Sequence, residues 1–208
     1  MERIKIPEPP RALLEVSGFP QFKPAKALNH FIAATILNEQ SELFNQDHIH
    51  LIAADIGFLW TNWPNKRNMK RVVGEAEMPN PKGGAWQKAR AERQLMDWFG
   101  GIPDFVITLS ADHRAECSDI EFLALLEHEL YHCGHAVDAF GMPRFRRSDG
   151  RPIFGIRGHD IEEFNGVVRR YGADAAGMDR VEFVNVVLQG PEIGPVRVRA
   201  LCGNCILV

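Results

Sequence analysis

Two histidines four residues apart, with a glutamate directly after the first, are the residues of this sequence best suited to chemistry. His128, Glu129 and His132 form the pattern His-Glu-x-x-His, which binds zinc when it lies on a helix. Histidines at this spacing share one helix face, so both imidazoles can bind the same ion. Glu129 is rotated by about 100° from His128. It would therefore flank the ion and act as general base on a metal-bound water.

A catalytic zinc site needs a third protein ligand, and the residues just after His132 are poor candidates. His135 lies one turn further, and three successive turns of a straight helix cannot surround a tetrahedral ion, so a supporting role is favoured. Asp138 stands where the metzincin pattern has its third ligand. However, Gly134 comes one position before the glycine that breaks the helix in that pattern.

The stretch GHDIEEF offers better candidates for the third ligand. His159 comes just before a predicted capped helix, from which it could project towards a neighbouring helix, and is the favoured ligand. Glu163 is the alternative, and would make the site gluzincin-like. Asp160 and Glu163 also fit a capping box, which explains Glu163 without a metal but does not explain His159.

The elements that must position these residues form an α+β pattern. Ser118 and Glu121 predict a capping box at the start of the active-site helix, which is expected to end before Gly141. A hairpin is predicted over residues 144–157, with its turn at Asp149-Gly150. The other predicted elements are a proline-rich extended arm over residues 1–24, helices over 25–45, 86–99, 160–172 and 178–188, and strands over 48–60, 70–78 and 104–109. The prediction is one domain over residues 1–208, with a small sheet packed on helices.

Composition sets limits on the class of protein. A net charge of -3 gives no case for nucleic-acid binding through bulk charge. We find no secretory signal and no apolar run long enough for a membrane span. The four cysteines do not suggest a disulfide framework, so a cytoplasmic protein is expected. The sequence predicts no oligomeric state.

Two further features could bind partners. The hairpin over residues 144–157 carries five arginines, which could bind an acidic peptide or nucleic acid, although a solvated surface is the simpler explanation. Cys202 and Cys205 form a Cys-x-x-Cys pair for which no partner pair is evident, and we assign no role to them.

The stretches LLEHELYHC and GHDIEEFNGVVRRYG resemble the putative phage metallopeptidases, a family found in phages and prophages. The resemblance covers about half of the chain, from DFVITLSADH to the HDIEEF helix. It implies a zinc-dependent peptidase on a minimal zincin-like α+β fold, acting on a peptide or protein, with His128, His132 and Glu129 in the roles given above. A second similarity is to SprT-like proteases, whose third ligand is a histidine followed closely by a phenylalanine. Here His159 and Phe164 have one extra residue between them.

Two hypotheses for the function remain. The first is a zinc metallopeptidase in which Glu129 activates a metal-bound water for attack on a peptide bond. The alternative is a non-catalytic zincin-like binding module with a structural metal, which would bind protein or nucleic acid. Glu129 favours the first hypothesis, because a structural metal site needs no carboxylate at that position.

Overall fold

The computed structural model describes residues 5–15, 18–67, 69–160, 178–194 and 201–202. The chain divides into two compact units, one of residues 1–157 with 198–208 and one of residues 158–197. Helices and a mixed sheet occur together, so the predicted α+β fold is confirmed. The single domain over residues 1–208 stays a prediction. Among the described residues, no helix has the length and apolar character needed to cross a membrane.

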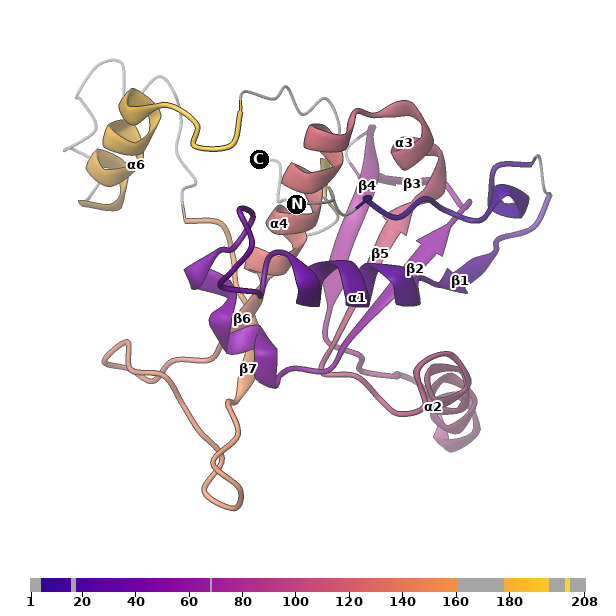
Figure 1. Ribbon diagram of the computed structural model, residues 1–208. Helices are drawn as coiled ribbons and strands as arrows, with labels where there is room; N and C mark the ends of the chain where they lie inside the picture. The colour runs from indigo at the N-terminus through magenta and orange to yellow at the C-terminus, as the bar shows by residue number, and fades with distance from the viewer. Residues whose placement is uncertain (1–4, 16–17, 68, 161–177, 195–200, 203–208) are drawn as a thin grey trace. The chain divides into compact units, whose positions relative to one another are not determined.

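The first unit is built around a mixed sheet (Figure 1). Its strand order is β1-β2-β5-β4-β3, and β8 also pairs with β4. These strands are β1 (Phe22–Pro24), β2 (Ile56–Thr61), β3 (Asn65–Arg67), β4 (Lys70–Glu77), β5 (Phe105–Ser110) and β8 (Leu201–Cys202). Strands β2 and β5 run parallel, whereas β4 is antiparallel to β5. The strand predicted over 70–78 is thus confirmed as β4, and β5 separates it from β2 in the sheet.

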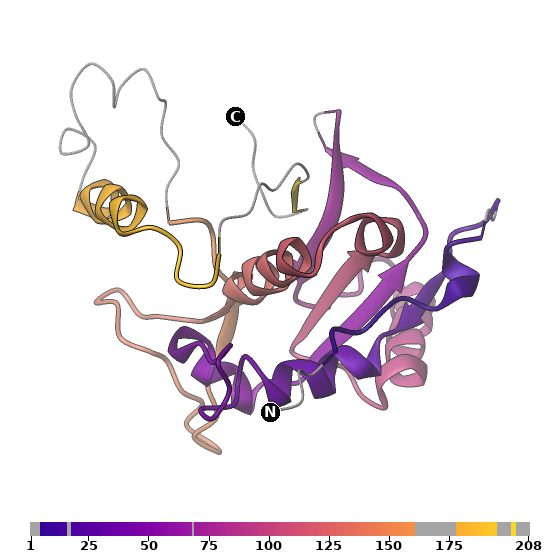
Figure 2. The ribbon, with the colours of Figure 1, turned by 45° about the horizontal axis from the view of Figure 1, so that its top comes forward.

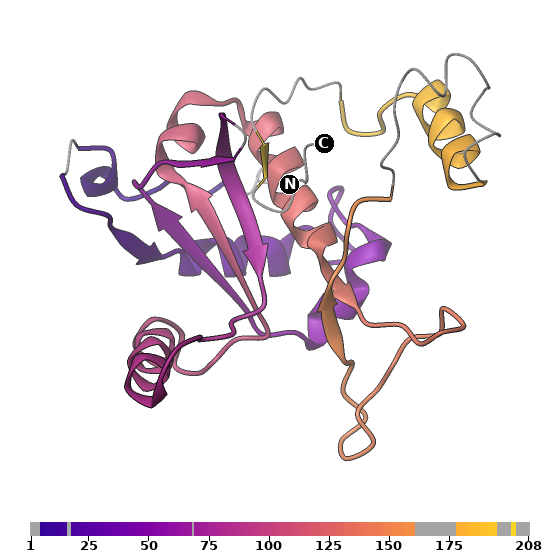
Figure 3. The same cartoon turned by 180° about the vertical axis from the view of Figure 1, so that it is seen from behind.

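The faces of the sheet are covered by different helices. One face of the sheet is marked by residues that pair in register, namely Trp60, Leu109 and Gly74. This face is covered by α1 (Lys26–Ala34) and α4 (Asp119–His132) (Figures 1 and 2). The Trp60 ring stacks on Phe122 of α4 with 5.6 Å between ring centroids. Figure 3 shows the sheet from behind. The Phe99 ring of α2 (Ala85–Phe99) lies against Gly57 of β2.

Helix α4 begins and buries one face as the sequence predicts. The Ser118 side chain accepts a hydrogen bond from the Glu121 backbone N–H, and the Glu121 carboxylate accepts one from the Ser118 N–H. The inward face follows helical spacing and consists of Phe122, Leu125, Leu126, Glu129, Leu130 and His132. The helix ends before Gly141, as predicted, and does so eight residues earlier at His132, because the backbone leaves helical geometry at Cys133. From there it forms β6 (Cys133–His135), which pairs antiparallel with β7 (Phe154–Ile156).

Local contacts explain two other departures from the predicted elements. Helix α1 stops at Ala34, well short of residue 45, where Thr35 leaves helical geometry and its hydroxyl donates to the Phe31 carbonyl. The strand predicted over 48–60 is wrong in its first half, which is the 3₁₀ helix η2 (Gln46–Ala53). The Asn45 side chain caps η2 by accepting from the Asp47 N–H. The helices predicted over 86–99 and 178–188 are confirmed as α2 and α6 (Met178–Gln189).

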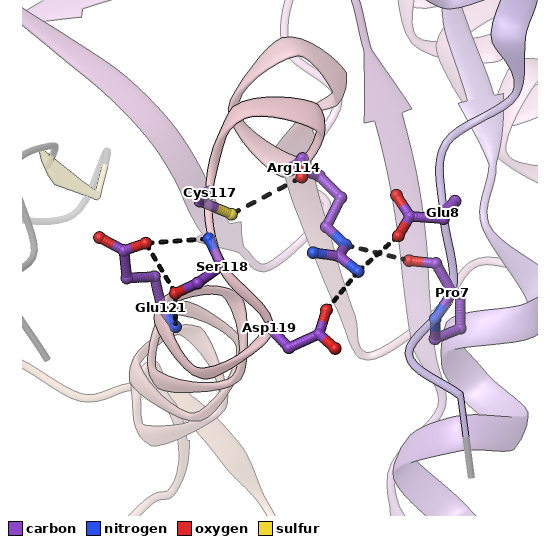
Figure 4. A network of polar contacts seen from close by, with 7 residues as sticks. All are labelled: Pro7, Glu8, Arg114, Cys117, Ser118, Asp119 and Glu121. Carbon is purple, nitrogen blue, oxygen red and sulfur yellow. Dashed lines mark hydrogen bonds and ion pairs between the residues drawn. The ribbon is translucent and has the colours of Figure 1, made fainter. Parts of the chain in front are cut away.

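A buried arginine ties the predicted N-terminal arm to the start of α4 (Figure 4). The arm contains one short helix, η1 (Arg11–Leu13). Arg114, on the short helix α3 (Ala111–Glu116), is only 4% exposed. Its guanidinium pairs with Glu8 at 2.6 Å and with Asp119 at 2.8 Å, and lies 4.9 Å from the centre of the Phe122 ring. The arm is therefore anchored at the N-terminus of the helix that carries His-Glu-x-x-His.

The second unit is described in part. Helix α6 is followed by Gly190 in a left-handed conformation, which suits a helix C-terminus. The helix predicted to start at Asp160 lies outside the described residues, as do Glu162 and Glu163.

Candidate metal centre

The two histidines of the motif converge at the end of α4. The Nε2 atoms of His128 and His132 are 3.2 Å apart, and their rings are nearly perpendicular. Two nitrogens that each lie about 2.0–2.1 Å from a tetrahedrally coordinated zinc ion are roughly 3.3 Å apart. The spacing of the two imidazoles therefore fits a shared ion.

The β6–β7 ladder fixes the orientation of His132. Its Nδ1 lies 2.7 Å from the backbone carbonyl oxygen of Arg157, and the Arg157 N–H donates to the His132 carbonyl at 2.9 Å. Because a carbonyl oxygen can only accept, Nδ1 carries the proton and the lone pair is on Nε2. This is the tautomer that a metal ligand needs, and its partner is the backbone contact typical of ligating histidines.

Glu129 is buried between α4 and β4. A Cβ atom placed on Gly74 would lie 2.6 Å from Glu129 Oε1, so only glycine leaves room for this carboxylate. Neither carboxylate oxygen has a regular hydrogen-bond partner among the described residues. Burial, followed by the nearby Glu75 charge, raises the pKa of Glu129 to about 8, although the Ala76 backbone N–H acts in the opposite direction. A buried carboxylate with so little compensation is costly for folding, and such groups concentrate at functional sites.

The last turn of α4 is held from outside by η2. The Tyr131 hydroxyl donates to the Asp47 carboxylate at 2.9 Å, and the Asn45 amide donates to the same hydroxyl. The His50 ring nitrogens face the carbonyl oxygens of Asp47 and Cys133. The contacts to Tyr131 and Cys133 carry no sequence signal, because they join residues more than 80 positions apart in the chain.

Other residues weighed from the sequence lie outside the helix. His135 is in β6, where Nε2 lies 2.8 Å from the Arg144 carbonyl oxygen. The Asp138 carboxylate accepts from the Phe140 and Met142 backbone N–H groups and so closes a turn. Cys133 is buried, as expected of a small apolar residue, and burial raises its pKa. Cys205 lies outside the described residues.

His159 stands at the start of the second unit, two residues after Arg157. Within the described part of the chain, one group of at least three His, Cys, Asp or Glu side chains could hold a metal ion, namely His128, His132 and His159. Imidazole is a usual zinc ligand, so the chemistry of this set suits zinc.

Comparison with known proteins identifies the family. The model of the family described as Putative phage metallopeptidase matches residues 29–188. No curated protein and no solved structure matches the chain. The family implies a bound metal and a peptide or protein substrate. Since the match spans most of the sequence, the chain belongs to the phage metallopeptidase family.

Proposed function

We propose that the protein is a zinc-dependent metallopeptidase in which His128, His132 and His159 hold the ion and Glu129 is the general base. The observation that carries this proposal is the 3.2 Å separation of the two Nε2 atoms on the helix turn that also carries a buried carboxylate. When bound, zinc lowers the pKa of its water to about 7 and polarises the scissile carbonyl.

We assign a role to each of three residues around the proposed ion from its position. The Arg157 carbonyl holds His132 in the tautomer whose Nε2 can bind the ion. Glu129 accepts a proton from the attacking water and later delivers it to the leaving amine. Gly74 keeps the space that the Glu129 carboxylate occupies. A structural role would not explain why this carboxylate is buried with so few partners.

His159 is proposed as the third ligand because of the path of the backbone. Arg157 is bonded to His132 through both its N–H and its carbonyl. Two further residues reach at most about 7 Å, so His159 follows within a short distance of chain. The alternative, Glu163, is six residues after Arg157 in the sequence and is also explained by helix capping.

The isosteric change Glu129→Gln tests the role of the base. We expect it to keep bound zinc, because both histidines of α4 remain, but to lower peptide cleavage by a factor of at least about 100. Zinc content and the kcat for a broad peptide library are the measurements. Glu127→Gln is the matched control, since it makes the same change two residues away on α4 and should cleave at the wild-type rate.

The same assay separates the two hypotheses. Cleavage that depends on both zinc and Glu129 supports the metallopeptidase. A wild-type protein that binds zinc but cleaves nothing across the library would instead support the binding module with a structural metal.

A further inference from the structure

The segment between β6 and β7, residues 136–153, forms an arm that extends from the first unit (Figures 1 and 3). It is folded by backbone hydrogen bonds that include Arg144 N–H to the Ala136 carbonyl and Arg146 N–H to the Arg151 carbonyl. Gly150 at its tip has a positive φ of 69°, which suits the tight turn predicted at Asp149-Gly150. We call this segment the arginine arm.

The charge of the arginine arm is opposite to that of the rest of the chain. Four arginines against two aspartates give it a formal charge of +2, so the remainder of the chain, at -3 overall, carries -5. Both aspartates are used within the arm: Asp138 closes one turn, and Asp149 accepts from the Arg151 N–H. Among the described residues, neither aspartate forms an ion pair with an arginine of the arm.

Three of these arginines point to solvent. Arg144, Arg146 and Arg147 are exposed, and their guanidinium groups have no partner among the described residues. Arg151 differs, since it binds the Ala53 carbonyl and Asp104 and so fixes the base of the arm. The arm also carries large apolar side chains that are exposed: Phe140 is 89% exposed, Met142 62% and Phe145 54%. A water-exposed surface that combines guanidinium groups with rings is typical of a contact surface.

The arm is rooted at the candidate metal centre. It leaves the chain through β6, directly after His132, and returns through β7, whose following residue Arg157 binds His132. Phe145 lies edge-on to His135, with 4.9 Å between ring centroids, and His135 stacks on His50. A chain bound along the arm would consequently run towards the motif on α4.

We propose that the arginine arm binds acidic, apolar-containing segments of the polypeptide substrate and brings them to the metal centre. This inference rests on the proposed peptidase function, because that function makes the partner a polypeptide. Carboxylates of the substrate pair with the three free guanidinium groups, while its apolar side chains contact Phe140, Met142 and Phe145. A nucleic acid fits less well, because it carries a charge at every nucleotide, whereas the exposed surface of the arm combines three arginines with the apolar side chains of Phe140, Met142 and Phe145.

Binding is tested on the full chain with Glu129→Gln, so that the probe is not cut. The probe is a fluorescein-labelled peptide in which glutamate alternates with leucine and glycine, and anisotropy reports binding. The triple variant Arg144→Gln, Arg146→Gln, Arg147→Gln should weaken binding by about tenfold or more. The matched control removes three exposed positive charges elsewhere, through Lys82→Gln, Lys88→Gln and Arg90→Gln, and should leave binding unchanged.

Comparison probes decide between the partners. The same peptide with lysine for glutamate, and an oligothymidylate of matched charge, should bind weakly. Equal loss in the two triple variants would overturn the proposal, since net charge alone would then explain binding. So would tighter binding of the oligothymidylate, or self-association that only the arm variant abolishes. Since this readout needs no cleavage, arm-dependent binding by a protein that cleaves no peptide would contradict the proposed function alone.

Discussion

Gly74 and Glu129 show how a site residue can depend on a neighbour that has no chemistry of its own. The glycine lies in β4, opposite the carboxylate on α4, and any side chain at residue 74 would overlap the carboxylate and Leu125. The position of the Glu129 carboxylate, the proposed general base, is therefore set by strand and helix together.

Gly74→Ala is predicted to impair cleavage more than metal binding. The new Cβ would displace the Glu129 carboxylate, so kcat/KM should fall by more than about tenfold, with a loss of about 1–3 kcal/mol in stability from overpacking. Zinc content should stay at the wild-type level, because Gly74 does not contact the histidines of α4. Gly101→Ala, at a glycine with open space around it, is the control. Wild-type cleavage by Gly74→Ala would show that the carboxylate does not need its present place.

At the same scale, sequence reasoning identified the residues whose spacing is local and missed those that packing brings in. His128, Glu129 and His132 follow from four-residue periodicity on one helix. Gly74 and the Arg157 carbonyl could not be found this way, because their roles arise from a strand packed on α4 and from the β6–β7 ladder. A backbone carbonyl, moreover, carries no sequence signal at all.

At the scale of elements, a local signal sets where α4 begins, and tertiary contacts set where it ends. The capping box of Ser118 and Glu121 places the start of α4 correctly. Its end at His132 depends on pairing of β6 with β7, which are separated in sequence by the whole arginine arm. The strand order likewise could not be predicted, since β5 pairs with two strands that precede it by different distances.

Arg114 gives a prediction at this scale. Arg114→Met should keep the apolar contact with Phe122 but release the N-terminal arm from α4. We expect a loss of about 1–3 kcal/mol in the free energy of unfolding, measured in urea. The carboxylates of Glu8 and Asp119 are at least half exposed, so they stay solvated when the arginine is removed. Faster proteolysis within the N-terminal arm should accompany this loss of stability. Arg93→Met breaks an exposed ion pair on α2 and should cost less than about 0.5 kcal/mol. Equal effects of the two changes would contradict the anchoring role.

At the scale of the whole molecule, stability should depend on pH through a buried histidine outside the candidate metal centre. His48 is buried, and its ring centroid lies 4.4 Å from that of Tyr131. Desolvation, followed by the neighbouring His50, lowers the pKa of His48 from 6.5 to about 4. The unfolded chain therefore binds a proton in this range that the folded chain does not, so stability is present above pH 6.5 and lost as the pH falls towards 4.

Replacing this histidine should remove that part of the pH dependence. Between about pH 7 and pH 5, the wild type should lose about 2 kcal/mol more stability than His48→Phe, which keeps a ring against Tyr131. Urea unfolding of both proteins at the two pH values measures the difference, and the titration of all other groups cancels. An identical pH dependence of the two proteins would show that His48 titrates normally in the folded state.

We propose that a single zinc ion is held by two histidines of α4 and by one histidine from beyond the arginine arm. Anomalous diffraction at the zinc edge, from crystals of the zinc-loaded full chain, tests it most directly. We predict one peak about 2.0–2.1 Å from Nε2 of both His128 and His132 and from a ring nitrogen of His159. A peak ligated by Glu163, with His159 turned away, would contradict the third ligand, and a peak remote from His128 and His132 would contradict the account as a whole.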